Sequence, residues 1–182
     1  KDVDYTVTYE NNVNVGTATI TIEGQGILRG TKTKTFDITT ADNSWVITPS
    51  INGWTWSWDD TSNAQEPTGA ATFGEVEYVY YVDESCTILT NSANSGADTE
   101  GGQPVNAGTY YLKAFVERYD TEDSNGHVGY WVDNNNVTHY NYEYLDRIIA
   151  FTIMPFNISS VSEVTINPDE YCVTGSAIEP DY

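Results

Sequence analysis

The sequence has few of the residues that build helices or bind polyanions. It contains one Met and four Lys, and no long run of the Ala, Leu, Glu and Lys residues that favour helices. Seven basic residues stand against 27 acidic ones, which gives a net charge of −20. Nucleic acids and anionic lipid surfaces attract proteins through basic side chains, so the composition argues against both as partners.

Cysteine and histidine are also scarce, with two of each. No Cys-x-x-Cys or Cys/His pattern exists, which argues against structural zinc. The sequence leaves open whether Cys86 and Cys172 form a disulfide. No run of apolar residues is long enough to span a bilayer as a helix.

Aromatic residues, tyrosine above all, are abundant instead. The chain has 14 Tyr, 5 Trp and 5 Phe, and these residues favour pleated, half-buried surfaces together with Val, Ile and Thr. Apolar and polar residues alternate over 5–9, so that Tyr5, Val7 and Tyr9 share one face of a strand. Composition and alternation together predict an all-β fold.

Three blocks of sequence occur twice, in the same order. The pairs are 3–9 with 76–81, 14–20 with 106–112, and 36–38 with 151–153. Such an echo indicates two copies of one structural unit. A third, partial copy is indicated at the end of the chain, where Glu179-Pro180 follow Tyr171 as Glu66-Pro67 follow Trp54.

The repeats predict one complete unit between two partial ones. The expected boundaries are a back half over 1–38, a linker over 39–44, a complete unit over 45–153, and the front of a further unit over 154–182. Strands of the complete unit are predicted at 45–47, 51–56, 71–73, 75–82, 108–118, 128–132 and 145–153. In the first partial unit, Phe36 and Ile38 are expected to face the core. Because the chain begins and ends inside repeats, we expect a window of a longer protein whose export signal or anchor lies outside it.

Two polar insertions enlarge the complete unit, at 83–105 and 120–144. They lengthen the spacing between the repeated blocks relative to the first copy. Insertions of this kind fall in surface loops, where binding functions are often located.

The repeated blocks resemble the tandem Ig-like and MBG-type repeats of large bacterial cell-surface proteins and adhesins. The resemblance is carried by the strand at 4–9, by Asn-x-Gly-Thr at Asn14 and Asn106, by Phe-x-Ile at Phe36 and Phe151, and by 171–180. It implies Ig-like β-sandwich repeats, with β-grasp-like units as the alternative, on the outside of a bacterial cell. It also implies a role as spacer or adhesive module. Tyr110 is a candidate for the tyrosine corner of Ig domains, although Ala18 stands at the matching place in the first copy.

Aromatic side chains supply the candidate ligand-binding residues. Trp54, Trp56 and Trp58 alternate and would share one face of a strand, either as a platform for sugar rings or as part of a sandwich core. Trp58 is the one expected to be exposed. The complete set of candidates for contacting a glycan or a host protein is Trp58, Tyr130, Trp131 and Asn134.

The acidic loop at 120–126 is the candidate metal site. Its oxygen ligands suit calcium and are Asp120, Glu122, Asp123 and Asn125. Thr121 and Val132 stand where an EF-hand needs acidic residues, so the loop is not an EF-hand. The alternatives are irregular calcium coordination and a solvated loop without metal. The spacing of His127 and His139 selects no metal.

The sequence contains no Gly-x-Ser-x-Gly motif and no phosphate-binding Gly-rich loop, so we expect no enzymatic activity and no cofactor apart from the calcium alternative. The expected function is a spacer and display scaffold. One alternative is a carbohydrate- or host-protein-binding adhesin domain that uses the 120–144 insertion. The other is a head-to-tail assembly, in which 1–38 and 157–182 of neighbouring copies pair through open strand edges.

Overall fold

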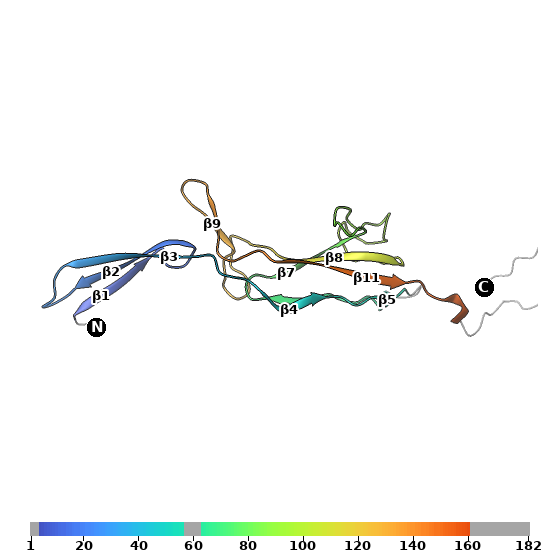
Figure 1. Ribbon diagram of the computed structural model, residues 1–182, viewed down its shortest axis with the longest axis horizontal. Helices are drawn as coiled ribbons and strands as arrows, with labels where there is room; N and C mark the ends of the chain where they lie inside the picture. The colour runs from blue at the N-terminus through green and yellow to red at the C-terminus, as the bar shows by residue number, and fades with distance from the viewer. Residues whose placement is uncertain (1–3, 57–62, 161–182) are drawn as a thin grey trace, which may run out of the picture.

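The computed structural model describes residues 4–56 and 63–160. This part of the chain is all-β, as predicted, and contains eleven strands, a short 3-10 helix η1 (Ile158–Ser160) and no α-helix. The molecule is elongated, with strands β1 to β3 at one end and η1 at the other (Figure 1). Trp58, Cys172 and the repeated features of 161–182 lie outside the described residues.

An antiparallel three-stranded sheet forms the N-terminal end. Its strands are β1 (Tyr5–Glu10), β2 (Gly16–Gly24) and β3 (Thr31–Ile38), in the order β1-β2-β3. The register sets Val7 opposite Ile22, Tyr9 opposite Ile20, and Ala18 opposite Phe36. Since directly opposed residues lie on the same face of a sheet, apolar residues gather on one face and threonines on the other.

The central unit contains a four-stranded sheet and a two-stranded one. The larger sheet has the order β5-β11-β8-β7, and its strands are β5 (Trp54–Thr55), β7 (Val76–Tyr81), β8 (Gly108–Val116) and β11 (Asp146–Met154). The smaller sheet pairs β4 (Trp45–Ser50) with β6 (Thr68–Ala71). Several sheets packed in this way are consistent with a β-sandwich. A separate hairpin pairs β9 (Tyr130–Val132) with β10 (Thr138–Tyr140), and β10 had not been predicted.

The core of the central unit is built around Phe151. Its ring lies 5.4 Å from Trp54, 6.0 Å from Tyr80 and 6.0 Å from Tyr110, measured between ring centroids. Leu112 fills the adjacent position and is fully buried. Trp54 is therefore a core residue and not part of an exposed platform. The Tyr110 hydroxyl donates to the backbone oxygen of Asn106 at 3.0 Å. Its role as the tyrosine corner of an Ig domain stays a prediction.

The 83–105 insertion closes the outer edge of β7. The Tyr80 N–H donates to the Gly101 oxygen at 3.0 Å, and the Thr90 N–H donates to the Tyr80 oxygen at 3.1 Å. Thr90 and Ser95 are fully buried inside the insertion. An uncovered edge strand invites pairing with other chains, so the insertion stabilises the sheet and protects it from association.

The three strands β1, β2, β3 and the three strands β7, β8, β11 are paired in the same way. Ala18 opposes Phe36 as Tyr110 opposes Phe151, which agrees with the sequence blocks. The first block is shifted, however. Tyr9 opposes Ile20 where Tyr80 opposes Leu112, so the structural match of β1 with β7 differs by two residues from the match of 3–9 with 76–81. A shift of two keeps every side chain on its face, which is why the sequence pattern tolerates it.

The two sheets differ in what covers them. Phe151 is 5% exposed beneath the segment that carries Trp54, whereas Phe36 is 42% exposed. The expectation that Phe36 faces a core was therefore wrong for the described part of the chain, because no second layer lies on β1–β3 there. Ile38 is half-buried.

Candidate functional site

The 120–144 insertion reaches back to the N-terminal sheet and holds the turn that precedes β2. The Trp131 indole Nε1–H donates to the Val15 oxygen at 2.9 Å, and the Val15 N–H donates to the Asn141 Oδ1 at 2.8 Å. Gly16 has a φ of 137°, and a Cβ there would lie 3.6 Å from the Trp131 ring. The turn is therefore fixed on both sides by residues more than a hundred positions away.

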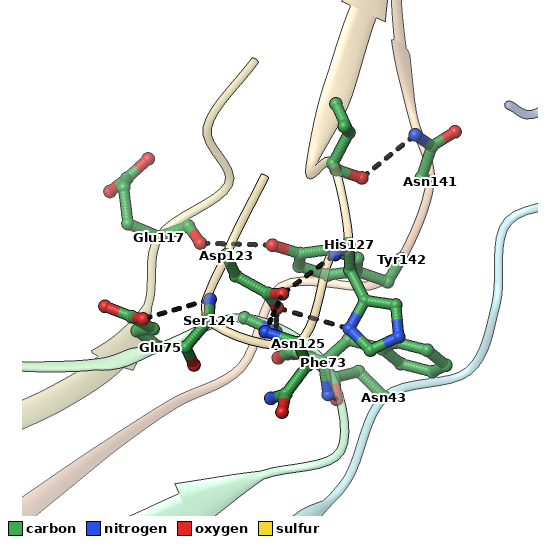
Figure 2. Close-up of polar contacts among 12 residues, drawn as sticks. Asn43, Phe73, Glu75, Glu117, Asp123, Ser124, Asn125, His127, Asn141 and Tyr142 are labelled. Atoms are coloured by element: carbon green, nitrogen blue, oxygen red, sulfur yellow. Dashed lines mark hydrogen bonds and ion pairs between the residues drawn. The ribbon is translucent and has the colours of Figure 1, made fainter. Parts of the chain in front are cut away.

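Asn141 is the centre of this junction. Its Nδ2 donates to the Asn14 Oδ1 and to the Val128 oxygen, both at 2.9 Å, and the second bond is drawn in Figure 2. Its backbone oxygen accepts from the Ala41 N–H at 2.9 Å. One half-buried residue, through its side chain and its backbone oxygen, thus joins the N-terminal sheet, the inserted segment and the connection between the two units.

The predicted linker at 39–44 is bonded along its length. The Thr40 hydroxyl donates to the Tyr140 oxygen at 2.9 Å, and Ala41 forms a parallel β-bridge with Tyr142. The Asn43 side chain, 9% exposed, donates through Nδ2 to the Phe73 oxygen at 3.1 Å. Because buried amides need such partners, these bonds fix the connection against the central unit.

The hairpin that carries Trp131 is organised by Asp133. The Asp133 Oδ1 accepts the Asn135 N–H at 2.8 Å and the Val137 N–H at 2.9 Å, and the Oδ2 lies 3.1 Å from the His139 Nε2. The pKa of Asp133 is lowered, mainly by the hydrogen bond from the Val137 N–H and next by the contact with His139. The His139 ring in turn stacks on Trp131 at 4.8 Å. One face of the indole is therefore already occupied by a side chain of the protein.

A groove runs between this hairpin and the N-terminal turn. It has a volume of 760 Å³ and includes five asparagines among its lining residues, namely Asn11, Asn12, Asn14, Asn134 and Asn135. The predicted ligand contacts Trp131 and Asn134 line it. Tyr130 is not among the lining residues, and its ring packs against Tyr140 at 6.2 Å. The fourth candidate, Trp58, lies outside the described residues.

Asp123 organises the acidic loop, as Figure 2 shows. Its side chain is 7% exposed; Oδ1 accepts the Asn125 and His127 N–H groups at 2.9 and 2.8 Å, and Oδ2 accepts the Gly74 N–H at 3.0 Å. Burial by itself would raise the pKa of Asp123, but these backbone bonds outweigh it and lower the pKa. The carboxylate thus fastens the loop to the start of β7.

The other predicted calcium ligands do not surround Asp123. Asp120, Glu122 and Asn125 are exposed, and no group of three or more His, Cys, Asp or Glu residues is placed to hold a metal within 4–56 and 63–160. His127 lies 3.3 Å from Asp123, whereas His139 contacts Asp133, so the two histidines belong to separate contacts.

Sequence reasoning selected Trp131 and Asn134 but missed Asn141 and Val15. Asn141 belongs to no motif. Val15 occupies the variable position of the Asn-x-Gly-Thr motif that starts at Asn14, and this motif marks the turn.

Comparisons with protein-family models, with curated proteins and with solved structures found no match to this chain. Among the described residues, no helix is long and apolar enough to cross a membrane.

Proposed function

We propose that this chain is a non-enzymatic spacer and display module of a bacterial cell-surface protein, exposed outside the cell. The observation that carries the proposal is the junction at Asn141, which joins two β units end to end. The sequence resemblance to tandem surface repeats points the same way. A module of this kind functions by keeping its length and its orientation fixed.

The proposal requires that the two β units are held rigidly relative to each other. Units joined by a short connection move relative to each other unless their contact is well bonded. Here the Trp131 and Asn141 side chains supply three hydrogen bonds to the Asn14–Val15 turn. Each hydrogen bond stabilises the contact by about 1 kcal/mol. Together the three bonds are enough to make the end-to-end arrangement of the two units the dominant one.

The proposal is tested by loosening the junction. Asn141→Ala removes two bonds to the turn, and we expect about tenfold faster hydrogen exchange at the Val15 amide, together with a broader distance distribution in small-angle X-ray scattering. Trp131→Phe removes the third bond and is expected to act in the same direction. Asn134→Ala, an exposed amide on the same hairpin, is the matched control and leaves both measurements unchanged. Identical scattering from Asn141→Ala and the wild-type chain would show that the junction does not set the shape.

The groove supports a second candidate function, the binding of a glycan or of a host protein. Five asparagines are among its lining residues beside Trp131, and amide groups suit the hydrogen-bonding pattern of sugar hydroxyls. On a glycan array, binding that Asn134→Ala abolishes without changing the scattering profile would support this function. Absence of binding across a broad panel leaves the spacer function alone.

A further inference from the structure

The N-terminal sheet presents an apolar face that lacks a covering layer in the described part of the chain. The apolar residues on this face are Tyr5, Val7, Tyr9, Ala18, Ile20, Ile22, Phe36 and Ile38. Tyr9, Phe36 and Ile22 are 53%, 42% and 40% exposed. The opposite face consists largely of threonines. A face of this composition is typical of a contact surface, because large apolar patches are rarely left in water.

In the central unit, the equivalent sheet is covered by an added strand that carries an aromatic ring. There, β5 adds to the edge of β11 in parallel, with Trp54 opposite Ile153, and the Trp54 ring stacks on Phe151 at 5.4 Å. By the shared strand pairing, β3 corresponds to β11, and Phe36 corresponds to Phe151. The N-terminal sheet therefore has a free strand edge at β3 and an aromatic ring without a stacking partner among the described residues.

The segment 161–182 has the sequence of a suitable partner. These 22 residues follow the described part of the chain, and they contain Tyr171, Val173 and Ala177 in alternation with small polar residues. Tyr171 precedes Glu179-Pro180 as Trp54 precedes Glu66-Pro67. The alternation is suited to a strand with one apolar face, with Tyr171 in the place that Trp54 takes in the central unit.

Charge favours the same pairing. Lys32 and Lys34 lie on the apolar face of β3, opposite Ile22 and Ile20, and both are exposed. Neither forms an ion pair within the described residues. The segment 161–182 carries five acidic residues and no basic one, so its charge complements that of the face.

We infer that the segment 161–182 of a second copy of this chain covers the β1–β3 sheet. It adds a strand along β3 and places Tyr171 over Phe36. Figure 1 shows the β1–β3 sheet and η1 at opposite ends of the elongated molecule, and residue 161 directly follows η1 in the sequence. Donor and acceptor are different surfaces; the contact is therefore heterologous and repeats head to tail.

Association of the full chain tests the inference. In analytical ultracentrifugation at physiological ionic strength, which screens the repulsion between chains of net charge −20, the mass rises above the 20.2 kDa monomer with concentration. Phe36→Asp weakens this association at least about a hundredfold, because it replaces the apolar ring by a carboxylate that must lose its water and that repels the acidic segment 161–182. Thr35→Asp adds the same charge on the opposite face of β3 and leaves association unchanged within about twofold. A wild-type chain that stays monomeric at millimolar concentration overturns the inference.

A mixing experiment separates this contact from the alternatives and from misfolding of a variant. Val173→Asp alters the donor segment and leaves the sheet intact; alone, it is monomeric, as is Phe36→Asp. Mixed in equal amounts, the two variants form a 1:1 dimer that does not grow, because one intact donor meets one intact face. Unimpaired association of Val173→Asp would mean that two faces pack on each other, and would overturn the inference.

The inference goes beyond the proposed function and is separable from it. Asn141→Ala is expected to associate like the wild-type chain, because the junction residue is not on the apolar face. Loss of association in the face and donor variants with unchanged scattering of the single module leaves the spacer function intact.

Discussion

Phe151→Ala is expected to lower the free energy of unfolding of the central unit by about 3–5 kcal/mol. The ring is 5% exposed and contacts three other aromatic rings, so its removal leaves a cavity that a well-packed core closes only in part. The variant Phe36→Ala at the equivalent strand position is expected to cost less than about 1 kcal/mol in dilute solution, since Phe36 is 42% exposed.

Urea denaturation followed by near-ultraviolet circular dichroism gives both values. The comparison is sharp because the same substitution is made at the same register position of two sheets that share the pairing of three strands. Equal losses of stability would contradict the picture of a covered central sheet and an uncovered N-terminal one. Protein concentration must stay low, because Phe36 also lies on the proposed contact surface between copies.

Gly74→Ala is expected to cost on the order of 2–4 kcal/mol. Gly74 has a φ of 75°, and an added Cβ would lie 2.5 Å from the Val116 Cγ1 and 2.8 Å from the Tyr142 hydroxyl. Both neighbours are buried, at 0% and 3% exposed, so neither can move aside cheaply. The Gly74 N–H also bonds to Asp123, and a shift of the backbone loosens the acidic loop.

Gly126→Ala is the control for this prediction. Gly126 has a similar φ of 82° but no atom within 4 Å of an added Cβ, so only the backbone strain of about 1 kcal/mol remains. The difference between the two variants in thermal or urea unfolding measures the steric conflict at Gly74. Equal effects would mean that the close packing around Val116 and Tyr142 relaxes freely.

The strands and the faces of the sheets could be predicted because they depend on local alternation. Tyr110 and Leu112 alternate with less buried residues, and their burial follows from that period of two. The shared pairing of Ala18 with Phe36 and of Tyr110 with Phe151 follows from blocks that repeat in sequence. The strand predicted at 51–56 covers only Trp54–Thr55 in the structure, and β10 was not predicted. Short strands in polar segments carry little periodic signal.

The junction could be predicted only in part. Trp131 was selected for its aromatic ring, but its contact with Val15 depends on the indole N–H and on a partner 116 residues away. Asn141 bonds to Asn14 and Val15 at separations of 127 and 126 residues. Asp123 was selected as a calcium ligand, whereas in the structure its carboxylate accepts backbone N–H groups. Single-sequence patterns describe neighbours along the chain and carry no information on such distant pairs.

The bonding of Ala41 determines how the molecule responds to tension along its length. The Ala41 N–H donates to the Asn141 oxygen at 2.9 Å, and the Ala41 oxygen accepts from the Glu143 N–H at 3.0 Å. A pull on the two ends therefore loads these bonds together with the covalent connection. Extension must break them before the connection straightens, so we expect the junction to act as a mechanical clamp that resists stretching.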